Sequence, residues 1–170
     1  MLTTAPRRHP GPAPVHVLGA RWLASANRQA TTAFTEWRAG QLAAIEIGRR
    51  FNVVRVTDQR LGTAALQDMQ LAGVVVGPVL LNRPWHAVEF LIALRQGEHW
   101  QMRDSELITR AMDGSPAVTV AMPAPGLPRT QGRSWLVPPD GRQFLTHPHN
   151  LANALRRART QLRRPPARRP

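Results

Sequence analysis

Two apolar runs in the middle of the chain, VVVGPVLLN (residues 74–82) and HAVEFLIAL (86–94), are separated only by RPW. Both runs are rich in valine, isoleucine, leucine and phenylalanine, a composition typical of buried strands. A connection this short favours a pair of neighbouring central strands. The chain is therefore expected to fold around a sheet.

Other segments supply the elements that surround this pair. Apolar residues at helical spacing predict helices at residues 15–27, 29–40, 61–73, 104–114 and 146–162. Alternating or continuous apolar runs predict further strands at residues 42–47, 51–57, 116–122 and 133–139. The first two of these strands flank GRR and predict a hairpin, and prolines make the last an edge strand. The order of elements predicts an α/β (α+β) fold, a sandwich in which a mixed sheet is flanked by helices.

The length of 170 residues and the hydrophobic content of 42% suit one domain, expected at residues 15–163. Residues 1–14 contain four prolines and two arginines without apolar periodicity, which predicts a disordered Pro/Arg-rich segment. The Arg/Pro-rich residues 164–170 predict a disordered tail.

The chain contains no cysteine, which excludes disulfides, thiolate zinc sites and a cysteine nucleophile. Its longest strongly apolar run, residues 71–81, is too short to cross a membrane, and the N-terminus lacks the apolar core of a signal peptide. A cytoplasmic protein without a membrane partner is expected.

The net charge of +13 is concentrated at the two ends of the chain. Residues 15–140 hold 13 arginines and all 10 acids, a net charge of only +3. The C-terminal run RRARTQLRRPPARRP contains seven arginines and no acid: Arg156, Arg157, Arg159, Arg163, Arg164, Arg168 and Arg169. These seven are candidate contacts to DNA or RNA phosphates without sequence preference. The alternative is a solvated helix end whose arginines complement the helix dipole, and the use of arginine for all 23 basic residues indicates GC-biased coding, which favours that alternative.

Five segments carry a resemblance to a known family: EWRAGQLAAIEIGRRFNVVRV, GPVLLN followed by HAVEFLIA, and WLVPPDG with LTHP after it. Together they resemble small bacterial proteins related to the N-terminal domain of bifunctional DNA primase/polymerases, over roughly residues 37–155. The resemblance implies a primase/polymerase-like sandwich and an ancestry in nucleotide polymerisation.

Active members of that wider group hold two metal ions with aspartates one residue apart at a strand end. On the matching segment NVVRVTDQRLG, those two positions are Arg55 and Thr57, and Asp58 follows one residue later. An arginine repels Mg²⁺, and threonine offers only a weak neutral oxygen. His86 matches the phosphate-contacting histidine of active primases. The resemblance therefore implies a vestigial site at Arg55, Asp58 and His86, with no catalytic residue, metal or cofactor.

Several residues also have simpler structural interpretations. Asp58 at a strand-to-helix junction is expected to cap the helix. Asp104 and Glu106, two apart on a predicted helix, would lie on different faces. His147 and His149 have no evident third metal ligand. The tryptophans Trp37 and Trp135 are expected in the core, and Trp85 in the turn RPW is expected on the surface, where it could contact a ligand.

Two functions of different class follow. The first is a catalytically inactive primase/polymerase-like domain that associates with nucleic acid through its basic C-terminal helix and tail. The alternative is a protein-interaction or regulatory module that reuses the fold. An active nucleotidyltransferase is a third and more distant interpretation.

Overall fold

The computed structural model describes residues 14–94, 99–112, 115–142 and 144–163. The predicted disordered ends, with Arg164, Arg168 and Arg169, lie outside this part of the chain, except for Pro14. Its elements in chain order are α1 (Val15–Ala24), α2 (Ala30–Arg38), β1 (Ala43–Glu46), β2 (Asn52–Val56), α3 (Gln59–Leu71), β3 (Val79–Asn82), the 3-10 helix η1 (Arg83–Trp85), β4 (Ala87–Ile92), β5 (Ser105–Ile108), β6 (Thr119–Met122), β7 (Arg133–Val137) and α4 (Pro148–Arg163).

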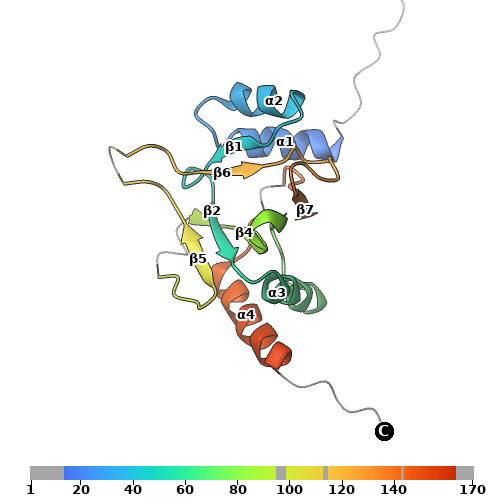
Figure 1. The fold of residues 1–170 in the computed structure, drawn as a ribbon, viewed down its shortest axis with the longest axis vertical. Coiled ribbons are helices and arrows are strands. Elements are labelled where there is room, and N and C mark those ends of the chain that lie inside the picture. Colours follow the sequence, from blue (N-terminus) through green and yellow to red (C-terminus); the bar gives the residue numbers. More distant parts are fainter. Residues whose placement is uncertain (1–13, 95–98, 113–114, 143, 164–170) are drawn as a thin grey trace, which may run out of the picture.

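Two antiparallel sheets form the centre of the fold. The larger has the strand order β5-β2-β4-β3-β7, and the smaller pairs β1 with β6. Helices α3 and α4 lie side by side on one face of the larger sheet, whereas α1, α2 and the smaller sheet lie towards its other face (Figure 1). The predicted α+β fold, a sheet flanked by helices, is confirmed, and β3 and β4 are neighbours as expected.

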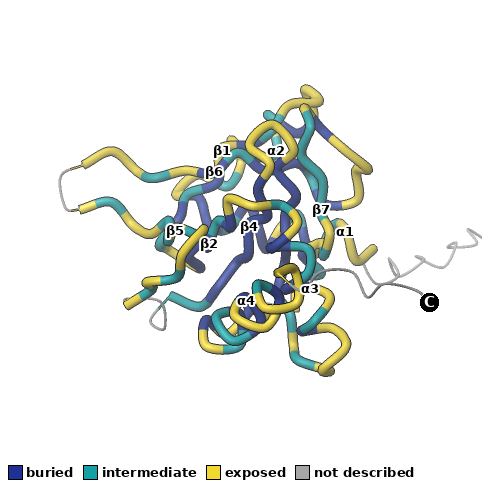
Figure 2. Tube along the Cα trace, turned by 60° about the horizontal axis from the view of Figure 1, so that its bottom comes forward, coloured by how far each residue is buried: buried dark blue, intermediate teal, exposed yellow. Residues whose placement is uncertain are grey.

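Each face of the larger sheet carries its own apolar core, because successive side chains of a strand point to opposite faces. Val54 and Val56 of β2 pack with α3 and α4, while Val53 packs with α1, α2 and the smaller sheet. All six residues of β4 are buried (Figure 2), which explains its continuous apolar sequence. The predicted apolar face of α3 is also confirmed, since its members are buried in the same core: Leu61, Ala65, Leu66 and Met69.

Two predictions of secondary structure and pairing are wrong. Within the segment predicted as a helix at residues 104–114, Ser105–Ile108 instead form strand β5, in which Leu107 packs against the core between the larger sheet and helices α3 and α4. Residues 42–47 and 51–57 form strands but do not pair with each other as a hairpin. Instead β1 pairs with β6, and β2 pairs with β4 and β5.

The turn at Gly48 explains why β1 and β2 separate. Gly48 has φ +86°, and a Cβ at this position would collide with the backbone of Arg110. A glycine in this conformation sends the chain from one sheet to the other. The edge position predicted for the strand at residues 133–139 is confirmed, because β7 lies at the end of the strand order.

No helix within the described part of the chain is long and apolar enough to span a membrane.

Candidate functional site

A row of charged side chains crosses one face of the larger sheet. Arg55 lies between two buried valines of β2 that face α3 and α4, so its side chain points to the opposite face. The strand register places Glu89 of β4 and Glu106 of β5 directly opposite Arg55, one on each side. Three charges are therefore adjacent on neighbouring strands, in the order acid, base, acid.

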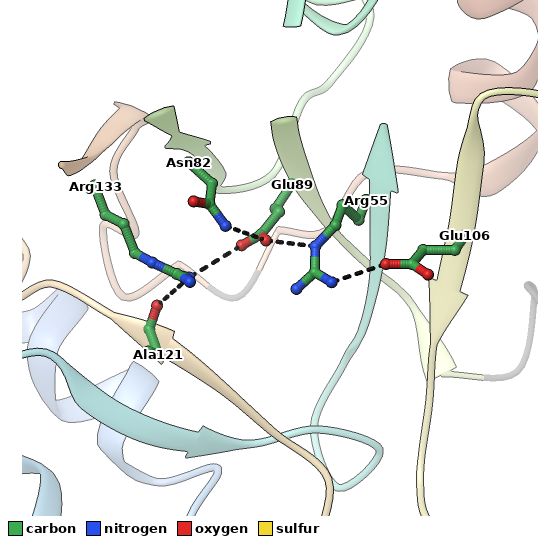
Figure 3. A network of polar contacts seen from close by, with 6 residues as sticks. All are labelled: Arg55, Asn82, Glu89, Glu106, Ala121 and Arg133. Carbon is green, nitrogen blue, oxygen red and sulfur yellow. Dashed lines mark hydrogen bonds and ion pairs between the residues drawn. The ribbon is translucent and has the colours of Figure 1, made fainter. Parts of the chain in front are cut away.

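Glu89 is the centre of this network (Figure 3). Its Oε1 atom accepts hydrogen bonds from Arg55 Nε at 2.8 Å and from Asn82 Nδ2 at 3.0 Å. Arg55 Nη1 also donates to Glu106 Oε1 at 2.8 Å. The Glu89 side chain is fully buried, whereas that of Glu106 is 54% exposed. The network thus runs from solvent into the interior.

Arg133 completes the network from the edge strand β7. Its Nη1 atom lies 3.7 Å from Glu89 Oε2 and donates to the carbonyl oxygen of Ala121 on β6 at 2.7 Å. Burial lowers the pKa of the Arg133 guanidinium, and the nearby Arg55 lowers it further, while the Glu89 carboxylate raises it. The side chain consequently links the two sheets and balances the buried carboxylate.

Two oxygen atoms of this network have no hydrogen-bond partner among the described residues, namely Glu89 Oε2 and Asn82 Oδ1. An unsatisfied buried oxygen costs free energy, and the ion pairs with Arg55 and Arg133 offset the cost of burying the Glu89 carboxylate. Arg55 is hydrogen-bonded to both glutamates of the network, Glu89 and Glu106.

Trp85 lies over this network from the turn between β3 and β4. Its ring centroid is 4.2 Å from Arg55 Cζ and 6.0 Å from Arg133 Cζ, which is the geometry of cation–π contacts. The residue is nevertheless 55% exposed, so the prediction of a surface tryptophan is confirmed. The exposed arginine Arg83 belongs to the same turn. The exposed ring of Trp85 thus packs against the guanidinium groups of Arg55 and Arg133.

The residues of the predicted vestigial site lie at one end of the larger sheet but do not converge. Asp58 and His86 line a surface hollow of about 440 Å³ together with Thr57, Gln59 and Arg60. Arg55 lies apart from this hollow, beneath Trp85. Asp58 Oδ1 accepts hydrogen bonds from the backbone N–H groups of Arg60 and Leu61, so the predicted helix cap is confirmed.

Helix α4 presents its arginines near the same end of the sheet, but two of them are tied to acids. Arg157 forms an ion pair with Asp68 of α3 at 2.6 Å, and this hydrogen bond raises the pKa of Arg157. Arg159 donates to the Arg103 carbonyl oxygen at 2.8 Å and lies 3.2 Å from Asp104 Oδ2.

The other two described arginines of α4 differ in their contacts. Arg156 donates to Asn153 Oδ1 at 2.9 Å, and Arg163 is exposed at the end of the helix. Arg156 and Arg163 are therefore the described members of the predicted phosphate-binding set that form no ion pair within the described chain.

The acids of β5 also differ from the prediction. The spacing of Asp104 and Glu106 was expected to put them on two faces of a helix. Asp104 instead has φ +59° in the turn before β5, and Glu106 points along the sheet towards Arg55. Each acid is bound to an arginine, since Asp104 pairs with Arg159.

The histidines His147 and His149 lie at the start of α4, with ring centroids 6.5 Å apart. His147 Nδ1 accepts a hydrogen bond from the backbone N–H of His149, which caps the first turn of the helix. Among the described residues, no group of three histidines or acids could hold a metal ion.

Three residues of the network, Glu89, Arg133 and Asn82, were not predicted from the sequence. A signal for Glu89 was present, because a single glutamate inside the apolar run HAVEFLIAL needs a cationic partner if the strand is buried. The residues opposite Glu89 depend on how β2, β4, β3 and β7 pair, and the sequence of β4 alone does not determine this pairing.

Comparison of the chain with protein-family models, with curated proteins and with solved structures finds no match in any of the three. The resemblance to primase/polymerases accordingly stays a prediction from the sequence.

Proposed function

We propose that this protein binds single-stranded DNA or RNA without sequence preference, at the end of the larger sheet that carries Trp85, and that it is catalytically inactive. The observation that carries the proposal is Trp85, an exposed ring supported from below by Arg55. Exposed aromatic rings stack on unpaired bases whatever the base, and neighbouring cations contact the phosphates.

Three arginines that form no ion pair with the described acids lie at the same end of the sheet as this ring. Arg83 belongs to the turn of Trp85, and Arg60 lines the adjacent hollow. Arg103 lies where α4 meets the start of β5, and its side chain is exposed. The basic C-terminal helix approaches this end of the sheet from the other face, where Arg159 contacts Arg103 and Asp104. Nearby acids add little negative charge, because Asp104 and Glu106 are paired and Asp58 caps α3.

The arrangement of carboxylates supports the absence of nucleotidyl transfer. Two-metal catalysis needs several carboxylates that are free to coordinate both ions. Here Arg55 lies between Glu89 and Glu106 and bonds to both, while Asp58 is held by backbone N–H groups. A primase/polymerase ancestry with a degenerate site is consistent with this arrangement.

Replacing Trp85 with alanine is expected to weaken binding of a single-stranded oligonucleotide of about 15 nucleotides by roughly 5- to 150-fold, since stacking contributes about 1–3 kcal/mol per base. Trp85→Phe is the matched control and should retain most of the affinity, because it preserves an aromatic face. Fluorescence anisotropy of a labelled oligonucleotide measures both. Equal affinities for Trp85→Ala and the parent chain would remove Trp85 from the interface.

A primer-extension assay tests the proposed absence of polymerase activity. The protein, given a primed template, nucleotides and Mg²⁺ or Mn²⁺, should extend no primer on a sequencing gel. Extension that is abolished by Asp58→Asn would contradict the proposal, because asparagine caps a helix as well as aspartate does and removes only the charge.

A further inference from the structure

A cleft at the opposite end of the larger sheet has no role in nucleic-acid binding as proposed above. It has a volume of about 420 Å³, which lies within the range of small-molecule sites. The lining residues come from α1, from the turn between β1 and β2 and from two later segments: Trp22, Ser25, Arg49, Arg50, Leu94 and Leu145. The cleft thus combines two cations with the apolar side chains of Trp22, Leu94 and Leu145.

The positive charge at this cleft exceeds the negative charge near it. Glu46 Oε2 lies 3.8 Å from both Arg49 and Arg28, and Glu46 Oε1 accepts a hydrogen bond from the backbone of Arg28. Arg50 forms no ion pair with a described acid, and its Nε makes only a long hydrogen bond of 3.4 Å to the Ser25 carbonyl oxygen. Arg49 and Arg50 both line the cleft, whereas Arg28 and Glu46 line the neighbouring hollow, so none of the described residues that line the cleft is an acid.

The turn that carries Arg49 and Arg50 is fixed by its flanking residues. Ile47 and Phe51 are buried on either side, and the Gly48 N–H donates to the Phe51 carbonyl oxygen at 2.8 Å. The Phe51 ring stacks on Trp22, with ring centroids 5.4 Å apart. Both arginines consequently project from an ordered backbone, which lowers the entropy lost when a ligand binds.

We propose that this cleft binds a small phosphate monoester that has a ring-shaped or apolar body. The dianionic phosphate of a monoester can pair with the two arginines of the cleft, and guanidinium groups bind phosphate oxygens with paired hydrogen bonds. The body of the ligand would lie against Trp22, Leu94 and Leu145. A nucleic-acid backbone is a less suitable occupant, because each of its diesters carries a single charge.

Isothermal titration with adenosine 5′-monophosphate, adenosine and inorganic phosphate tests the site. The monophosphate should bind with a stoichiometry of one, and adenosine should not bind measurably. Inorganic phosphate should bind more weakly than the monophosphate, because it makes no contact with the apolar walls. Equal affinity for adenosine and the monophosphate, or for phosphate and the monophosphate, would overturn the proposal.

Charge variants distinguish binding of the monophosphate at this cleft from its general electrostatic attraction to a positively charged protein. Arg49→Gln/Arg50→Gln should weaken monophosphate binding by about 10- to 100-fold, the effect of losing a hydrogen bond to a charged group. Arg21→Gln/Arg38→Gln removes the same charge from exposed positions on α1 and α2 and should leave binding unchanged. The single variant Arg50→Gln provides a second test if the double variant has a lower melting temperature. Equal losses in the two double variants would overturn the proposal.

Trp85→Ala distinguishes this site from the proposed nucleic-acid interface. The variant should leave monophosphate binding unchanged, because Trp85 lies at the other end of the sheet. Loss of monophosphate binding in Trp85→Ala would assign the ligand to the nucleic-acid interface and contradict the inference, while the affinity for oligonucleotides tests the proposed function separately.

Discussion

Replacing Glu89 with alanine is expected to lower the free energy of unfolding by about 3–5 kcal/mol, because the change removes one partner of a buried ion pair and leaves the other charged in the interior. Glu89 is fully buried, and the side chains of its partners Arg55 and Arg133 are only 12% exposed. Urea unfolding followed by far-ultraviolet circular dichroism measures the loss.

The exposed acid of the same network supplies the matched control. Glu106→Ala removes a partner of Arg55 that is 54% exposed, and ion pairs near the surface contribute only about 0–1 kcal/mol. Glu89→Gln removes the charge but keeps the shape, so its cost should lie between those of the other two variants. A loss below about 1 kcal/mol for Glu89→Ala would show that the network does not depend on its central carboxylate.

Replacing Trp37 with alanine is expected to cost about 3–5 kcal/mol, the usual range for removing a large aromatic ring from a core. The ring is 8% exposed, packs edge-to-face on Phe34 at 5.7 Å and donates from Nε1 to the Met122 carbonyl oxygen at 3.0 Å. The substitution leaves a cavity and removes the side-chain hydrogen bond that joins α2 to β6. Thermal or urea unfolding measures the change in the free energy of unfolding.

The stability losses expected for two other Trp→Ala variants can be compared with that of Trp37→Ala. Trp135 was also expected in the core, but it is only partly buried on the edge strand, with Nε1 bonded to the Pro123 carbonyl oxygen. Trp135→Ala should therefore cost less than Trp37→Ala. Trp85→Ala should cost less than Trp37→Ala, since it removes an exposed ring and its cation–π contacts with Arg55 and Arg133. A Trp37 variant as stable as the Trp85 variant would contradict the packing of α2 on the smaller sheet.

The elements that the sequence predicted well are those whose own residues determine their structure. The runs at residues 74–82 and 86–94 contain β3 and β4, although β3 begins only at Val79, and the spacing of Leu61, Leu66 and Met69 defines the buried face of α3. Asp58 was assigned correctly for the same reason, because a helix cap depends on neighbouring residues alone.

The errors concern features that depend on distant parts of the chain. The segment SELI has mixed propensity and becomes a strand because β2 offers it an edge, with Glu106 opposite Arg55. The pairing of β1 with β6 joins residues more than 70 positions apart, which local turn signals could not reveal. The buried network at Glu89 was missed for the same reason, since its partners lie on three other strands.

The central claim, that a cationic and aromatic surface at the Trp85 end of the sheet binds single-stranded nucleic acid, is tested most directly by the salt dependence of binding. About five arginine–phosphate contacts predict that log K falls against log salt with a slope of about −3 to −4 for single strands.

Removing two of these contacts in Arg60→Gln/Arg83→Gln should reduce the size of the slope by about 1.4, and a chain ending at Arg163 should also show a smaller slope. Arg21→Gln/Arg38→Gln, with the same loss of charge on α1 and α2, should keep the slope of the parent chain. Fluorescence anisotropy between about 50 and 200 mM salt measures all four slopes. Absence of binding at the lowest salt, or equal changes in the two double variants, would contradict the account.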